Sequence, residues 1–113
     1  MHTCHAHGCN KAVPASMFMC RGHWYTLRKE LRDAIWREYR TGQEVDKKPS
    51  KRYMAVQRRA VGEVAFKPHD EQAAKVSAKY LLDSERWRGL AIAEGLGDPL
   101  AGLTTNKPLV TVT

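Results

Sequence analysis

All three cysteines of the chain and four of its five histidines lie within its first 23 residues. The stretch CHAHGCNKAVPASMFMCRGHW contains two short-range pairs: Cys4 with Cys9, spaced as Cys-x4-Cys, and Cys20 with His23, spaced as Cys-x2-His. Each pair is short enough for both side chains to reach one ion, and tetrahedral Zn(II) accepts three thiolates and an imidazole. The sequence therefore predicts a structural Zn(II) site with these four residues as its ligands.

Other uses of the cysteines fit this pattern less well. Three cysteines cannot all pair within one chain, and the N-terminal sequence lacks the apolar segment of a secretory signal, so clustered reduced thiols favour a metal over disulfides. A catalytic cysteine would need a histidine and an orienting group that the sequence does not place. Four protein ligands also leave no open position for a catalytic metal. His5 and His7 are alternatives to His23 as the fourth ligand.

The residues between the two pairs predict a small, irregular fold. Gly8 permits the tight turn that a ligand knuckle requires. The turn signal at residues 14–16 separates Val13 from the apolar run 17–19, which predicts a short hairpin. Cys20 and His23 then open a helical pattern. A knuckle, a hairpin and a helix, in this order over residues 1–25, are typical of a treble-clef-like zinc finger.

The apolar pattern after the cysteines predicts a first helix from about Cys20 to about Arg40, with Gly42 as its C-terminal stop. As an alternative, Thr26 caps a restart, so that the first turn is a separate short helix. The residues predicted to face inward are Trp24, Leu27, Leu31, Ala34, Ile35 and Tyr39.

Two further helices are predicted. Ser50 caps the second, over residues 51–66, and Asp70 caps the third, over about 71–94, with a split at residues 83–84 as an alternative. The inward residues predicted for the second helix are Tyr53, Val56, Ala60, Val61 and Val64. Those predicted for the third are Ala73, Val76, Tyr80, Leu81, Trp87 and Ala91.

The predicted fold is thus mainly α: a small zinc finger leads into a three- to four-helix domain, all within one domain of 113 residues. Its parts are the knuckle and hairpin (1–25), the basic helices (26–66), the C-terminal helix (67–97) and a loose tail (98–113). The tail sequence LVTV is a candidate strand beside the hairpin. No apolar run approaches the roughly 18 residues of a membrane span.

Charge is distributed unevenly along the chain. Residues 1–60 contain 13 lysines and arginines against 5 acidic residues, a net of +8, whereas residues 61–113 contain 6 against 7, a net of −1. A basic first half indicates a polyanionic partner. The predicted binding surface combines these cations with one aromatic residue that can stack on a base. Its members are Lys29, Arg32, Trp36, Arg40, Lys47, Lys48, Lys51, Arg52, Arg58 and Arg59.

The segment MCRGHWYTLRKELRDAIWREYRTGQE, with PSKRY after it, resembles a family of short, mostly uncharacterised proteins of bacteriophages and prophages. Those proteins begin with a Cys/Cys and Cys-x2-His knuckle, continue with His-Trp and then show a segment like LRDAIW..YR.GQE. The resemblance covers about residues 4–55. It implies the same four ligands, a phage or prophage origin and a location in the host cytoplasm. The relatives tend to have prolines near Arg28 and Glu30 that this chain lacks, and residues after about 67 look like an extension.

These features favour a non-enzymatic, zinc-stabilised protein that binds DNA or RNA. The alternative is a phage effector, such as an anti-CRISPR protein, that inhibits a host protein complex: a CRISPR interference complex or RNA polymerase. A zinc-finger-associated nuclease of the His/Asn type is disfavoured, because it needs a catalytic histidine and a second metal site. The spare histidines all lie in the knuckle apart from His69, and no acidic cluster accompanies them.

Overall fold

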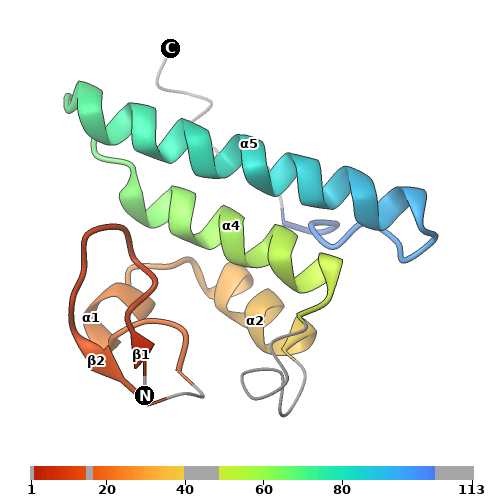
Figure 1. Cartoon of the computed structure of the whole chain (residues 1–113), viewed down its shortest axis with the longest axis horizontal. Helices are drawn as coiled ribbons and strands as arrows, with labels where there is room; N and C mark the ends of the chain where they lie inside the picture. Colours follow the sequence, from red (N-terminus) through yellow and green to blue (C-terminus); the bar gives the residue numbers. More distant parts are fainter. Residues whose placement is uncertain (1, 15–16, 40–48, 104–113) are drawn as a thin grey trace.

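The computed structural model describes residues 2–14, 17–39 and 49–103 (Figure 1). Within these ranges, a two-stranded antiparallel sheet precedes four helices. The elements are β1 (His2–Thr3), β2 (Ala12–Val13), α1 (Arg21–Trp24), α2 (Lys29–Glu38), α4 (Lys51–Ala65) and α5 (Glu71–Ala93). The chain is therefore mainly helical with a Cys/His cluster at its N-terminal end, as the sequence predicts.

Helix α4 is the centre of the fold. It packs along α5 on one side and against α2 on the other, and the knuckle lies beside the α2 side (Figure 1). Val56 and Val61, two of its predicted inward residues, are almost completely buried. They share one hydrophobic cluster with Phe18 and Met19 of the N-terminal segment and with Leu31 of α2. The metal-binding segment and the helices thus share a single core.

Both predicted helix caps are confirmed. The hydroxyl of Ser50 accepts a hydrogen bond from the backbone N–H of Tyr53 at the start of α4. The carboxylate of Asp70 accepts one from the N–H of Ala73 at the start of α5. Each side chain satisfies an N–H group that has no partner within the first turn of its helix.

Two buried serines of α5 donate hydrogen bonds to α4 where the two helices pack together. The hydroxyl of Ser77 donates to the carbonyl of Gly62 at 2.7 Å, and that of Ser84 donates to the carbonyl of Ala55 at 2.6 Å.

The predicted alternative of a split at residues 83–84 is wrong, because α5 runs unbroken through Ser84, which is 1% exposed. Of the predicted inward residues of α5, Ala91 is fully buried and the others are half-buried.

The first predicted helix is two helices. Helix α1 ends at Trp24, and α2 begins at Lys29 after the extended residue Arg28. The restart alternative is therefore right, but its position is wrong: the hydroxyl of Thr26 donates to the carbonyl of His23 at 2.6 Å instead of capping α2. Helix α2 also ends earlier than predicted, at Glu38. Gly42, the predicted stop, lies outside the described residues.

The predicted hairpin has different strands. The partner of Val13 is His2, and that of Ala12 is Thr3, so the two strands flank the knuckle instead of following it. The N–H of Met17 donates to the carbonyl of Pro14 at 2.9 Å, and the predicted turn residues 15–16 between them lie outside the described residues. Residues 17–19 form no strand in the described structure, and two of them, Phe18 and Met19, are used in the core.

The chain after α5 is packed, which corrects the predicted loose tail for residues 98–103. Pro99 and Leu100 are buried, and Asp98 forms an ion pair with Arg88 at 2.9 Å. The guanidinium of Arg37 donates to the carbonyl of Pro99 at 2.8 Å. These contacts hold the segment against α2 and α5. The rest of the predicted tail, with its candidate strand LVTV, lies outside the described residues.

Candidate metal centre and basic surface

Local structure positions each of the four predicted ligands. Cys4 follows β1 directly. Cys9 ends a tight turn in which its N–H donates to the carbonyl of Ala6 at 3.0 Å, and Gly8 adopts φ 82°, a conformation that favours glycine. Cys20 is the residue that precedes α1, and His23 lies within this helix. The turn therefore brings Cys4 and Cys9 together, and the start of α1 brings Cys20 and His23 together, with both pairs directed at one point.

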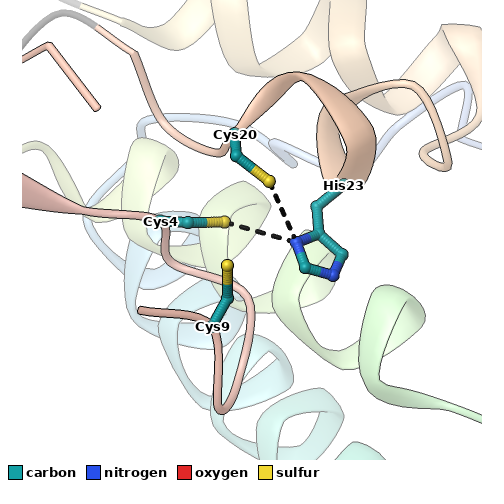
Figure 2. A group of neighbouring side chains, drawn as sticks. All are labelled: Cys4, Cys9, Cys20 and His23. Carbon is teal, nitrogen blue, oxygen red and sulfur yellow. Dashed lines mark hydrogen bonds between the residues drawn. The ribbon is translucent and has the colours of Figure 1, made fainter. Parts of the chain in front are cut away.

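The four ligand atoms converge as the sequence predicts. All lie within 4.8 Å of one another. The Nδ1 atom of His23 is 3.5 Å from Sγ of Cys4 and 3.3 Å from Sγ of Cys20, and the sulfur of Cys9 points toward the same space (Figure 2). In a tetrahedral zinc site, bonds of about 2.3 Å to sulfur and about 2.0 Å to nitrogen place these atoms roughly 3.5 Å apart. The four atoms are therefore close enough to hold a single metal ion.

The backbone around the cluster stabilises negative charge on sulfur. The pKa of the Cys20 thiol is lowered to about 7, chiefly because the backbone N–H of His23 donates to its sulfur. Burial raises the pKa of Cys4, although the N–H of Ala6 donates to that sulfur at 3.5 Å. Thiolate is the form that binds a metal. The Cys-x2-His spacing thus brings the two ligands together and also places the backbone N–H of His23 at the sulfur of Cys20, which favours the thiolate form.

The other histidines of the segment make different contacts. The ring of His5 stacks on Phe18 with centroids 4.9 Å apart, and the ring of His7 lies edge-on to Tyr80 at 6.1 Å. In the described ranges, the only group of cysteine, histidine and acidic side chains close enough to hold an ion is the one that contains His23. The cluster of Cys4, Cys9, Cys20 and His23 can therefore hold a metal ion without His5 or His7.

The arginines of α4 that are predicted for the basic surface form ion pairs with carboxylates of the protein itself. Arg52 pairs with Glu38 at 2.8 Å, Arg58 with Asp83 at 3.0 Å, and Arg59 with Glu63 at 2.7 Å. The side chain of Arg59 is only 15% exposed. Each of these three predicted members of the binding surface is thus paired with a carboxylate of the protein itself. Helical periodicity reveals the i,i+4 partner of Arg59, Glu63, but not the partners of Arg52 and Arg58, which lie on α2 and α5.

The remaining predicted cations lie nearer the surface. Lys51 forms a partly exposed pair with Glu94 at 3.0 Å, and Lys29 forms an exposed pair with Asp33 at 2.9 Å. Three predicted members, Arg40, Lys47 and Lys48, lie outside the described residues.

Cationic and aromatic side chains alternate across α1 and α2. The guanidinium carbons of Arg21 and Arg32 lie 5.9 and 5.1 Å from the ring centroid of Tyr25. Trp36 follows Arg32 by one helical turn and is 56% exposed, and Tyr25 is 62% exposed. We call Arg21, Tyr25, Arg32 and Trp36 the Arg–aromatic strip. Arg32 and Trp36 are among the residues predicted for the binding surface, whereas Arg21 and Tyr25 are not, although both lie within two residues of the predicted ligand His23.

A comparison of the chain with protein families, curated proteins and solved structures finds no match. The resemblance to phage proteins therefore stays a prediction. Among the described helices, none combines the length and the apolar composition needed to cross a bilayer.

Proposed function

We propose that the chain is a zinc-stabilised, non-enzymatic protein that binds nucleic acid through the Arg–aromatic strip. Three sulfurs and one imidazole nitrogen within 4.8 Å of one another favour Zn(II) over harder metals that prefer oxygen. Four protein ligands leave no position for a reacting water, so the ion has a structural role. The observation that supports nucleic acid is that the exposed Arg21 and the half-buried Arg32 lie beside the exposed rings of Tyr25 and Trp36.

The zinc is proposed to attach the knuckle to α1. Helix α1 has four residues, and β1 and β2 have two each, so none of these elements is stable by itself. One ion that joins Cys4 and Cys9 to Cys20 and His23 fixes their relative positions. Structural zinc contributes about 10–16 kcal/mol of apparent binding free energy in small zinc fingers, coupled to folding.

Binding is tested with fluorescently labelled DNA and RNA, single-stranded and duplex, at low salt. The double variant Arg21→Ala/Arg32→Ala should weaken binding and lower the magnitude of the salt slope by about 1.4 on a single strand, or about 1.8 on a duplex. The matched control is Arg86→Ala on α5. Its guanidinium lies 5.1 Å from the ring centroid of Trp87 and pairs with Asp83 at 2.8 Å, so the control removes a cation–ring contact outside the strip whose charge is already neutralised. Equal losses in both variants would contradict the proposed surface.

A second candidate is the phage effector that binds and inhibits a host protein complex, in the host cytoplasm. Tryptophan, tyrosine and arginine are the residue types enriched at the energetic centres of protein interfaces. The internal pairing of Arg52, Arg58 and Arg59 also leaves fewer cations for phosphates than the sequence predicts. This candidate is favoured if no nucleic acid binds at low salt and the strip instead captures a component of the CRISPR interference complex or of RNA polymerase.

A further inference from the structure

The Arg–aromatic strip is continuous. The rings and the guanidinium groups follow one another from α1 to α2, because Arg32 contacts the ring of Tyr25 and lies one turn before Trp36 on α2. Among the described residues, neither Arg21 nor Arg32 forms an ion pair, in contrast to the arginines of α4. Two cations that are free to contact phosphates therefore lie beside two exposed rings.

Trp36 is exposed but held in place. Its ring packs edge-on against Trp24, with centroids 6.1 Å apart, and against Tyr39, at 5.8 Å. Trp24 and Tyr39 themselves pack against the hydrophobic core. A large ring that is held by two aromatic neighbours and is 56% exposed loses little conformational freedom when a flat ligand stacks on it.

The charges around the strip do not suit a duplex. Helix α2 also carries Glu30, Asp33 and Glu38, and Asp33 already neutralises Lys29. Few phosphate contacts remain, whereas non-specific duplex binding depends almost entirely on such contacts. In a duplex the flat faces of the bases are covered by their neighbours, so the exposed rings of Tyr25 and Trp36 would gain no stacking partner. A single strand offers both phosphates and free base faces.

We infer that the nucleic acid is single-stranded, with bases stacked on Trp36 and Tyr25 and with phosphates bound by Arg21 and Arg32. This inference rests on the proposed function. The contacts involve no hydrogen bonds to base edges, so binding is tolerant of sequence. Two phosphate contacts give a slope of log K against log salt of about −1.4 on a single strand.

The metal centre positions half of the strip. Arg21 and Tyr25 flank the three residues that contain the ligand His23, and α1 begins next to Cys20. A four-residue helix does not persist without support. Removal of the metal should therefore displace these two side chains and weaken single-strand binding, whereas Trp36 remains on the longer helix α2.

The test compares three labelled ligands by fluorescence anisotropy: a thymine single strand, an abasic strand with the same number of phosphates, and a duplex. One stacked base is worth about 5- to 150-fold in affinity. We expect the thymine strand to bind at least about 5-fold more tightly than the abasic strand, which is the lower end of this range. It should also bind more tightly than the duplex. Equal affinity for the thymine and abasic strands would overturn the inference but leave the proposed function intact. Tighter binding of the duplex would do the same. Failure of all three ligands to bind would overturn the proposed function itself.

Variants of the two rings separate stacking from a structural role. Trp36→Ala should lower affinity for the thymine strand about 5- to 150-fold and leave the abasic strand unchanged. Tyr25→Phe should bind like the wild type, whereas Tyr25→Ala should lose affinity. The control is Leu82→Ala, which removes an apolar side chain that is 72% exposed on α5. Equal losses for thymine and abasic strands in Trp36→Ala would show that the ring only supports the fold, which would overturn its stacking role.

Discussion

Gly62 on α4 gives a sharp test of the packing between α4 and α5. In an open helix, replacement of glycine by alanine stabilises a protein by about 1 kcal/mol, because glycine loses more backbone entropy on folding. At Gly62, however, an added Cβ would lie 2.9 Å from Cδ2 of Leu81 and 3.2 Å from the backbone carbonyl oxygen of Ser77. Leu81 can adjust its rotamer, but the carbonyl moves only if the helices separate. This separation would stretch the 2.7 Å hydrogen bond from the Ser77 hydroxyl to Gly62.

Gly89 on α5 is the matched control, because nothing lies within 4 Å of the Cβ that alanine would add there. The two substitutions share the same gain in helix propensity, so the difference between them isolates the packing cost, about 1–3 kcal/mol for an overpacked core position. We expect Gly89→Ala to be more stable than the wild type and Gly62→Ala to be less stable than Gly89→Ala by this amount. Urea denaturation of the metal-loaded protein measures both. If the two variants are equally stabilised, the close approach of the helices at Gly62 is refuted.

Three further outcomes are expected. Cys9→Ser should lose bound metal in elemental analysis while His5→Ala keeps one equivalent; the opposite result would move a ligand. Ser84→Ala should cost about 1 kcal/mol, or about 4 °C in Tm by circular dichroism, because its hydroxyl bonds α4 to α5. A Tm equal to that of the wild type would show that this bond adds nothing. The hydrogen bond from Arg52 holds the pKa of Glu38 below its usual value in the folded protein. This hydrogen bond should therefore stabilise the folded protein fully above about pH 5, and the stabilisation should be lost as the pH falls through the lowered pKa. Denaturation curves at pH 7 and pH 4 measure this loss, and Glu38→Gln should abolish this part of the pH dependence.

The metal ligands were predictable because the information is local. A Cys-x4-Cys turn and a Cys-x2-His helix start each bring two ligands together through a few residues of backbone. The helix caps Ser50 and Asp70 were predictable for the same reason, since a cap bonds to the N–H three residues away. The two ligand pairs are separated from each other in the chain, but they are expected to come together because one metal ion binds both.

Features that depend on packing between distant segments were not predictable in this way. Arg58 has the periodicity of an exposed cation, yet Asp83 of α5 lies opposite it. Ser84 has the polarity of a helix break or a surface residue, yet its hydroxyl finds a carbonyl of α4 in the core. Leu100 lies in a segment without helical period but is 7% exposed. The partner is 25 residues away for Arg58 and 29 for Ser84, and the guanidinium of Arg37 bonds the carbonyl of Pro99 across 62 residues.

The position of the four ligands also affects how the chain is made. They all precede α2, α4 and α5, so a ribosome completes the metal site first. At about 5–20 residues per second, the end of α5 follows His23 by roughly 4–14 seconds. A metal ion captured in this interval orders the nascent segment around Phe18 and Met19 before the helices that share their core have been synthesised. If the chain binds zinc as proposed, metal supply would therefore act on its folding during translation, before α4 is complete.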